Sequence, residues 1–295
     1  MKFWERFSRI IFNLTILVSG EKIQVKSIES VLKNAVALID AESLSQMRSY
    51  VINQQTCEGG FSDRAGKCDI YYSLFGCYVA EALDVTTITI PLKQYVLEVV
   101  QKDNLKGINL HCAAILYSKL FGLDTFPKQL RKKVLADLHQ TSSQLPIYSN
   151  FLSLLTYYYL KDLKGIYRII KRLKNNNQVS DMPCPVTAAQ TVLLSLARKP
   201  FDETVKRLMS FYRGKGGFAA LHQTPVEDLL STAVALYALN FTNSDTRLIK
   251  PDCLEYVDSL FRDGGFRSTE PDVEIDIEYT FYGLLALGSL NKVLL

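Results

Sequence analysis

The residues best suited to chemistry form a run of carboxylates near the C-terminus. Asp272, Glu274, Asp276 and Glu278 place four acids within seven residues. Mutual repulsion and partial burial should raise the pKa of at least one of them, as a general acid requires. The alternative is structural, because acids in the first turn of a helix are stabilised by the helix dipole and often do only that.

Basic side chains form a second candidate site, for an anion. Arg64 and Lys67 closely follow a Gly-Gly-Phe segment that begins at residue 59. Further basic residues flank two more copies of this segment: Arg213, Lys215, Arg262 and Arg267. Basic side chains beside helix N-termini bind phosphate groups. The alternative interpretation is that these are solvated loop charges.

The Gly-Gly-Phe segments belong to a repeat that must position these residues. The pattern Gly-Gly-Phe followed by Asp-x-x-x-Ser/Thr occurs at 59–73, 216–232 and 264–280, each time before an apolar helix. The glycines allow a turn, the Phe anchors it in the core, and the Asp begins the helix. Three more apolar helices continue the rhythm without the glycines, at 109–121, 148–160 and 185–197.

A more polar helix precedes each apolar one. These amphipathic segments lie at 42–55, 91–102, 127–140, 162–174, 202–213 and 249–261. Six such pairs predict an all-α fold, and the apolar helices favour a closed α6/α6 toroid of helical hairpins over an open solenoid. The inner helices then begin at one end of the toroid. Asp69, Asp228 and Asp276 should gather there.

The toroid should comprise residues 42–295, preceded by amphipathic helices in residues 1–41. Residues 1–19 have apolar side chains at helical spacing beside basic ones. They fit a helix lying on a membrane surface, an uncleaved leader, or a helix packed on the domain. Six scattered cysteines indicate reduced thiols and a cytoplasmic protein. No transmembrane helix is expected.

The repeat resembles that of the protein prenyltransferase β-subunit and terpene cyclase superfamily. The segment from Gly264 to Gly288 is the nearest match, and the resemblance covers roughly residues 42 to 290. It implies an α/α toroid that handles an isoprenoid or another long apolar ligand. Aromatic residues on the inner helices suit such a ligand and would stabilise a carbocation.

The zinc site of the prenyltransferases is not matched. The family places Asp-x-Cys at one repeat and Asp-x-x-His at the next, whereas the corresponding residues here are Asp69 with Tyr71, Asp228 with Leu230, and Asp276 with Tyr279. Neutral Tyr and Leu do not replace thiolate and imidazole. We therefore expect no zinc and assign no residue to a metal.

The other sites follow from the same resemblance. Class II terpene cyclases carry Asp-x-Asp-Asp-Thr, and alignment on Thr280 places Glu278 where the proton donor would be, with Asp276 before it. Both are predicted catalytic residues. Arg64 and Lys67 match the segment in which prenyltransferases hold the diphosphate, and they are predicted to bind substrate together with Asp69, Tyr71, Asp228 and Tyr279.

Residues 127–174 form a basic face, with ten Lys/Arg against two acids, so their net charge is +8 and that of the remaining chain is −4. This face suits anionic lipid or an acidic partner, or is simply solvated. No nucleic-acid motif accompanies it. The sequence favours a zinc-independent prenyltransferase-like or terpene-cyclase-like enzyme, peripheral to the membrane if residues 1–19 or the basic face bind it. The alternative is a non-catalytic toroid that binds a lipid or protein.

Overall fold

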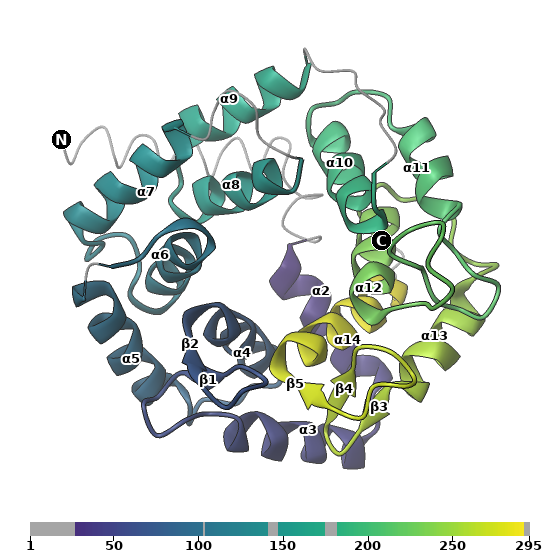
Figure 1. The fold of residues 1–295 in the computed structure, drawn as a ribbon, viewed down its shortest axis with the longest axis horizontal. Helices are drawn as coiled ribbons and strands as arrows, with labels where there is room; N and C mark the ends of the chain where they lie inside the picture. Colours follow the sequence, from purple (N-terminus) through teal and green to yellow (C-terminus); the bar gives the residue numbers. More distant parts are fainter. Residues whose placement is uncertain (1–26, 103, 141–146, 175–181, 292–295) are drawn as a thin grey trace.

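Two concentric rings of helices make up the protein (Figure 1). The computed structural model describes residues 27–102, 104–140, 147–174 and 182–291. The inner helices are α4 (Ile70–Ala82), α6 (Gly107–Phe121), α8 (Ile147–Tyr159), α10 (Cys184–Leu196), α12 (Leu229–Phe241) and α14 (Ile277–Leu290). The outer helices, along the perimeter, are α3 (Ala41–Asn53), α5 (Thr89–Gln101), α7 (Lys128–Gln140), α9 (Leu163–Lys174), α11 (Asp202–Met209) and α13 (Lys250–Ser259).

The inner ring is closed. Each inner helix packs against the next one along the chain, and α14 packs against α4 to complete the circle. These helices are apolar on most of their surface because they are covered by outer helices as well as by their inner neighbours. The predicted all-α, α6/α6 toroid is confirmed.

One geometry recurs in the three complete repeats. The backbone N–H of the Phe donates to a Ser or Thr hydroxyl in the first turn of the inner helix, from Phe61 to Ser73 (2.9 Å), Phe218 to Thr232 (2.9 Å) and Phe266 to Thr280 (3.3 Å). In each copy the Phe also pairs with the Asp that precedes the inner helix. The repeat therefore fixes the start of α4, α12 and α14 in the same way.

Short strands form where the turns pair. Strands β1 (Phe61–Ser62) and β2 (Cys68–Asp69) make one hairpin, and β3 (Phe261–Arg262), β4 (Gly265–Arg267) and β5 (Ile275–Asp276) make a three-stranded sheet. These turns adjoin the N-termini of α4 and α14. Backbone hydrogen bonds link the last two Gly-Gly-Phe turns to the start of the preceding inner helix. The N–H of Leu229 donates to the carbonyl of Ser268, and the N–H of Cys184 donates to the carbonyl of Ala220. We call this end of the toroid the mouth.

The turn of the last repeat packs against α3, the first of the outer helices, and so closes the outer ring. Gly264 has a φ of +84°, and a Cβ atom there would lie 2.5 Å from the carbonyl oxygen of Gln46 in α3. At the next residue, Gly265, the ring of Tyr50 from α3 occupies the space that a side chain would need. Only glycine allows both this conformation and this approach.

Helix α2 (Ile28–Ala35), followed by the short 3-10 helix η1 (Val36–Leu38), lies against α14 and α4. A side chain at Gly288 would clash with the carbonyl of Val31, so the two helices are in close contact. The predicted boundary at residues 41/42 remains a prediction, and residues 1–19 lie outside the described part of the chain.

A cluster of charged and phenolic groups joins α2 to the C-terminal ends of α4, α6 and α8. Lys119 lies 3.0 Å from Glu29 and 2.8 Å from Glu81, and the hydroxyl of Tyr159 donates to Glu29. Lys119 also lies over the ring of Tyr78, 4.6 Å from its centre. We call these residues the base cluster, because they lie at the opposite ends of the inner helices from the mouth. Across the described segments, no helix combines the length and apolarity that a membrane span requires.

Candidate active site

Arg64 bridges the first repeat to the last one at the mouth. It lies on the turn between β1 and β2, where the carboxylate of Asp63 accepts the backbone N–H groups of Ala65 and Lys67. Its guanidinium donates to Asp276 (2.6 Å) and Asp272 (3.0 Å). Of the predicted pair, Arg64 is thus bound to the carboxylate run, whereas Lys67 is exposed on the same turn.

Asp276 is bound on two sides. Its side chain is buried, and besides the ion pair with Arg64 it accepts the backbone N–H of Tyr279 at 2.7 Å, which caps α14. Asp276 is therefore the ion-pair partner of Arg64 and the N-cap of α14. Asp276 and Glu278 thus have different contacts, and the catalytic role of each remains a prediction.

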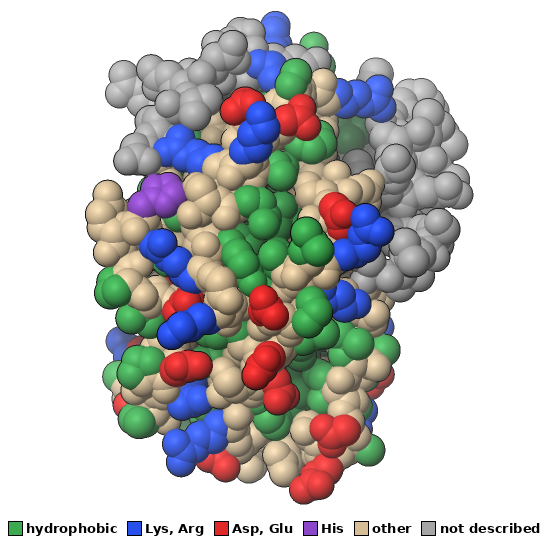
Figure 2. Space-filling model, turned by 90° about the vertical axis from the view of Figure 1, so that its right-hand side faces the viewer, with side chains coloured by type: hydrophobic (Ala, Val, Ile, Leu, Met, Phe, Trp, Pro, Cys, Tyr) green, Lys and Arg blue, Asp and Glu red, His purple; other side chains and the backbone are tan. Residues whose placement is uncertain are grey.

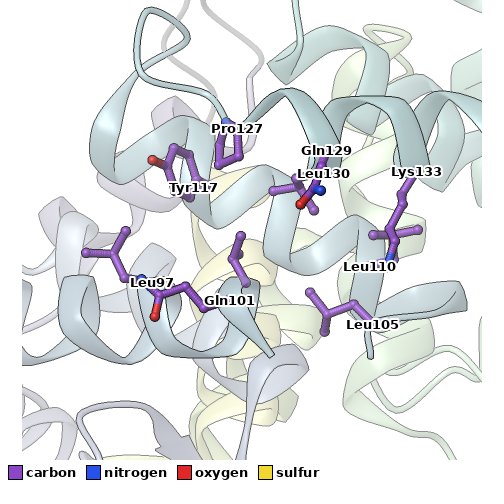
Figure 3. Close-up of a pocket in the computed structure, with 10 residues that line it drawn as sticks. Leu97, Gln101, Leu105, Leu110, Tyr117, Pro127, Gln129, Leu130 and Lys133 are labelled. Atoms are coloured by element: carbon purple, nitrogen blue, oxygen red, sulfur yellow. The ribbon is translucent and has the colours of Figure 1, made fainter. Parts of the chain in front are cut away.

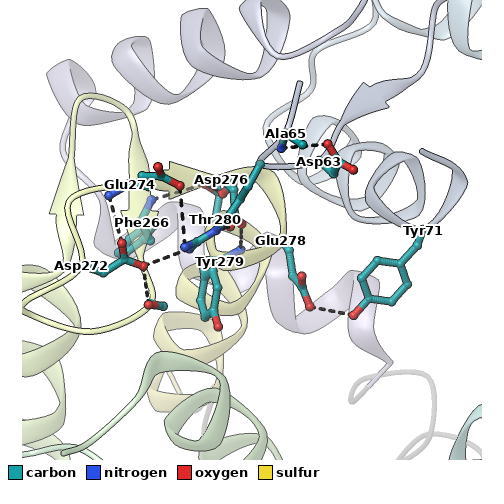
Figure 4. Close-up of polar contacts among 12 residues, drawn as sticks. Asp63, Ala65, Tyr71, Phe266, Asp272, Glu274, Asp276, Glu278, Tyr279 and Thr280 are labelled. Carbon is teal, nitrogen blue, oxygen red and sulfur yellow. Dashed lines mark hydrogen bonds and ion pairs between the residues drawn. The ribbon is translucent and has the colours of Figure 1, made fainter. Parts of the chain in front are cut away.

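Glu278 lies in the first turn of α14 and points towards Tyr71 of α4 (Figure 4). Its Oε1 accepts the hydroxyl of Tyr71 at 2.7 Å. Burial raises the pKa of Glu278, and the charge of nearby Asp276 adds to this, while the hydrogen bond from Tyr71 opposes it without cancelling it. A half-buried carboxyl group with a raised pKa is the state that a general acid needs.

The pKa of Asp272 moves in the opposite direction. Although its partial burial acts to raise the pKa, hydrogen bonds from Ser268, the backbone of Glu274 and Arg64 lower it below the ordinary value. The pKa values of two carboxyl groups in the same run are therefore shifted in opposite directions. Such a division is typical of sites that carry out acid–base chemistry.

Tyr279 follows Glu278 in the first turn of α14 and contacts Arg64. The guanidinium of Arg64 lies 5.2 Å from the centre of its ring. Burial raises the pKa of Tyr279 to about 12, and the charges of Glu278 and Asp228 contribute to the shift. Tyr279 therefore remains a neutral phenol at physiological pH.

Asp69 and Asp228 are helix caps. Asp69 accepts the backbone N–H groups of Tyr71 and Tyr72, and Asp228 accepts that of Ser231 at 2.7 Å. Burial raises the pKa of Asp228, and the hydrogen bond from Ser231 opposes the shift. Their role in binding a substrate remains a prediction.

Aromatic rings lead from Glu278 towards the base cluster. Tyr71 contacts Phe75, with ring centres 4.8 Å apart, Phe75 contacts Phe281 at 4.9 Å, and Phe281 contacts Tyr78 at 5.6 Å. Tyr78 shares a hydrogen bond of 2.5 Å with Tyr159. This series of rings connects the carboxyl group at the mouth with the polar groups at the base.

The residues in the zinc register do not fit a zinc ion. Tyr71 donates its hydroxyl to Glu278, and the carboxylate of Asp69 is occupied by two backbone amides. Cys68 is not placed to help, since its thiol contacts the hydroxyl of Thr56. Within the described ranges, no group of three or more His, Cys, Asp or Glu side chains could hold a metal ion.

We predict that the purified protein contains no stoichiometric zinc, because Tyr71, Leu230 and Tyr279 occupy the ligand positions. Elemental analysis after dialysis against a weak chelator measures the zinc content directly. About one zinc per chain would overturn the prediction.

The sequence did not show which basic side chains at the mouth already have hydrogen-bond partners within the protein. Arg213 and Arg267, predicted as part of an anion site, donate to backbone carbonyls, with contacts of 2.7 Å to His222 and 2.6 Å to Ser259. The base cluster was missed as well. A lysine in the otherwise apolar segment 109–121 was its one signal, because a buried lysine needs a partner.

Comparison with known proteins places the chain in a family. A family model described as a prenyltransferase alpha-alpha toroid domain matches residues 13–112 and 182–294. No curated protein matched the sequence. The unmatched stretch, 113–181, contains α7 to α9, where the repeat lacks its glycines, and the matched part includes Arg64, Tyr71 and the carboxylate run. Because the match covers more than half of the chain, the protein belongs to the prenyltransferase alpha-alpha toroid domain family.

Proposed function

We propose that the protein binds an isoprenoid or another long apolar ligand and acts on it as a zinc-independent, terpene-cyclase-like enzyme. The observation that carries the proposal is Glu278, a half-buried carboxyl group whose pKa is raised and which accepts the Tyr71 hydroxyl. Arg64 neutralises the neighbouring Asp276, so the two acids have different roles. The proposal includes a cytoplasmic location, since all six cysteines are free thiols.

In the proposed reaction Glu278 gives its proton to a carbon–carbon double bond. Because Tyr71 donates to Oε1, the proposal assigns the transferred proton to Oε2. Transfer forms a C–H bond, leaves a carboxylate on Glu278, and creates a carbocation at the adjacent carbon. The faces of Tyr71, Phe75 and Phe281 are suited to stabilise this charge. Loss of a proton from the cation at the end of the reaction restores a neutral product.

A prenyltransferase-like reaction would instead require a diphosphate group to bind at the mouth. A diphosphate at Arg64 and Lys67 must displace Asp272 and Asp276 from the guanidinium, and this exchange costs two charge-assisted hydrogen bonds. The geometry therefore supports an uncharged polyprene better than a prenyl diphosphate. A non-catalytic toroid would bind such a ligand without changing it.

Native mass spectrometry with a panel of uncharged polyprenes and prenyl diphosphates separates these cases. We expect a bound polyprene and, after incubation, a product of the same mass that differs in chromatography. Diphosphate binding that weakens more than tenfold in the variant with Arg64→Ala and Lys67→Ala, about 1.4 kcal/mol, would favour the transferase. Binding without any product would favour the non-catalytic toroid.

Replacing Tyr71 with Phe should move the pH dependence of turnover to higher pH. The hydroxyl of Tyr71 stabilises the charged form of Glu278, so its removal raises the pKa of Glu278 further. A general acid is active below its pKa, and the activity is lost as the pH rises through it. The measurement is the pH profile of kcat for both proteins. An alkaline limb that stays in place would show that Glu278 is not the titrating group.

A further inference from the structure

A groove on the outside of the ring lies beside the basic face. It runs between the outer helices α5 and α7, which both pack on the inner helix α6. Figure 3 shows Leu97 and Gln101 on the α5 side and Gln129, Leu130 and Lys133 on the α7 side. The cavity has a volume of about 400 Å³. Pockets that hold small ligands have ~300–1,000 Å³.

The groove is apolar inside and polar at its edge. Its floor consists of Leu110 and Tyr117 from α6, and Leu105 completes one side. Leu97 at the rim is 37% exposed, so the groove is open to solvent. An apolar channel with a polar rim fits a ligand that has a hydrocarbon chain and a polar end.

The charges at the rim indicate the sign of that polar end. Lys132 follows Gln129 by three residues and is exposed, which places it on the same side of α7 one turn further on. Lys133 lines the groove itself. On the other side Lys93 precedes Leu97 by four residues and lies 5.7 Å from the ring centre of Phe121. The rim is therefore cationic on both helices.

The excess of positive charge is concentrated in one sector of the ring. Helices α7 and α9 lie side by side on its perimeter (Figure 1) and carry most of the cations that give residues 127–174 their net charge of +8. The face on the far side of the ring, near α11 and α13, shows acidic and basic side chains mixed around hydrophobic ones (Figure 2). A confined basic sector attracts an anionic surface in one orientation.

We propose that the protein binds anionic membranes through this sector, and that the groove between α5 and α7 takes one acyl chain of an anionic lipid. The head group then lies against Lys132 and Lys133, and the chain lies against Leu97, Leu110 and Tyr117. Two signals, electrostatic and apolar, are what stable binding to a membrane surface requires. The inference does not depend on the proposed reaction.

Vesicle sedimentation with the full chain tests the proposal. Binding is expected to vesicles that contain phosphatidylcholine and phosphatidylserine, to fall with added salt, and to be at least tenfold weaker with phosphatidylcholine alone. Equal binding to both kinds of vesicle, or to neither, would overturn the proposal. Saturable 1:1 binding of monomeric oleate without any vesicle binding would overturn it too, because the ligand would then be a free fatty acid.

Matched variants locate the contact. Leu97→Asp should weaken vesicle binding more than tenfold, and Leu248→Asp, the same change at a site 93% exposed before α13, should leave it within about twofold. Lys132→Glu with Lys133→Glu should abolish binding, whereas Lys215→Glu with Lys250→Glu, which changes the net charge equally, should not. Circular dichroism confirms that each variant is folded. If Leu97→Asp and Leu248→Asp bind alike, the membrane contact lies elsewhere and the proposal is wrong.

Discussion

Replacing Glu278 with Gln is expected to lower product formation at least ~100-fold, the usual contribution of a general acid. Gln has the shape of Glu and still accepts the Tyr71 hydroxyl, but it has no proton to transfer. Product formation from a polyprene identified by mass spectrometry is the quantity to measure. The predicted loss is in kcat, because the substrate contacts remain.

The thermal stability of the Glu278→Gln variant, unlike its activity, should not fall. The pKa of Glu278 is raised in the folded state from its ordinary value of 4.5. Its contribution to stability is therefore complete below that value and is lost as the pH rises through the folded-state pKa. Above the folded-state pKa, where Glu278 would be a buried charge, the Gln variant should melt at the same temperature as the parent or a higher one.

Two neighbouring acids serve as controls for this variant. Glu274, whose side chain is 62% exposed, should tolerate Gln without loss of activity. Asp276→Asn weakens the ion pair with Arg64 and the cap of α14, so it should lower the free energy of unfolding by roughly 0.5 to 2 kcal/mol. Full activity of Glu278→Gln on an identified substrate would show that the proposed acid mechanism is wrong.

A large loss of stability is expected from Gly264→Ala. Alanine at a φ of +84° is strained by about 1–2 kcal/mol. In addition, its Cβ would lie 2.5 Å from the carbonyl oxygen of Gln46, and relieving such overpacking costs ~1–3 kcal/mol. The sum is roughly 2 to 5 kcal/mol, to be measured by chemical denaturation.

Gly66→Ala separates the two causes. Gly66 has a φ of +76°, but no atom lies within 4 Å of the Cβ position there. This variant should lose only the strain of about 1–2 kcal/mol. If both variants lose the same amount, the approach of the last repeat to α3 contributes nothing to stability.

The fold could be predicted from the sequence because the repeat carries its own geometry. The same Gly-Gly-Phe and Asp-x-x-x-Ser/Thr pattern specifies a turn, a helix cap and a hydroxyl that accepts the Phe amide, and all three are local. Helical periodicity predicted the remaining pairs even where the glycines are absent. Ring closure followed from the apolar character of the inner helices, which needs a neighbour on each side.

The site could be predicted only in part. The carboxylate run and Arg64 were both identified, but not that they bind each other, since 212 residues separate Arg64 from Asp276. The different contacts of Asp276 and Glu278 could not be predicted either, because they depend on the direction in which each side chain points at the start of α14. The base cluster needs four separate segments to meet.

Closure of the ring by α14 sets the order of events on the ribosome. Helix α14 packs on both α12 and α4, so these two helices keep an uncovered apolar edge until residues 277–290 have emerged. A nascent chain that stalls before residue 277 is therefore an open arc of helices with an exposed apolar edge at each end. Chaperones and proteases recognise such exposed apolar surface. Copies truncated before residue 277 cannot bury these apolar edges and should be degraded.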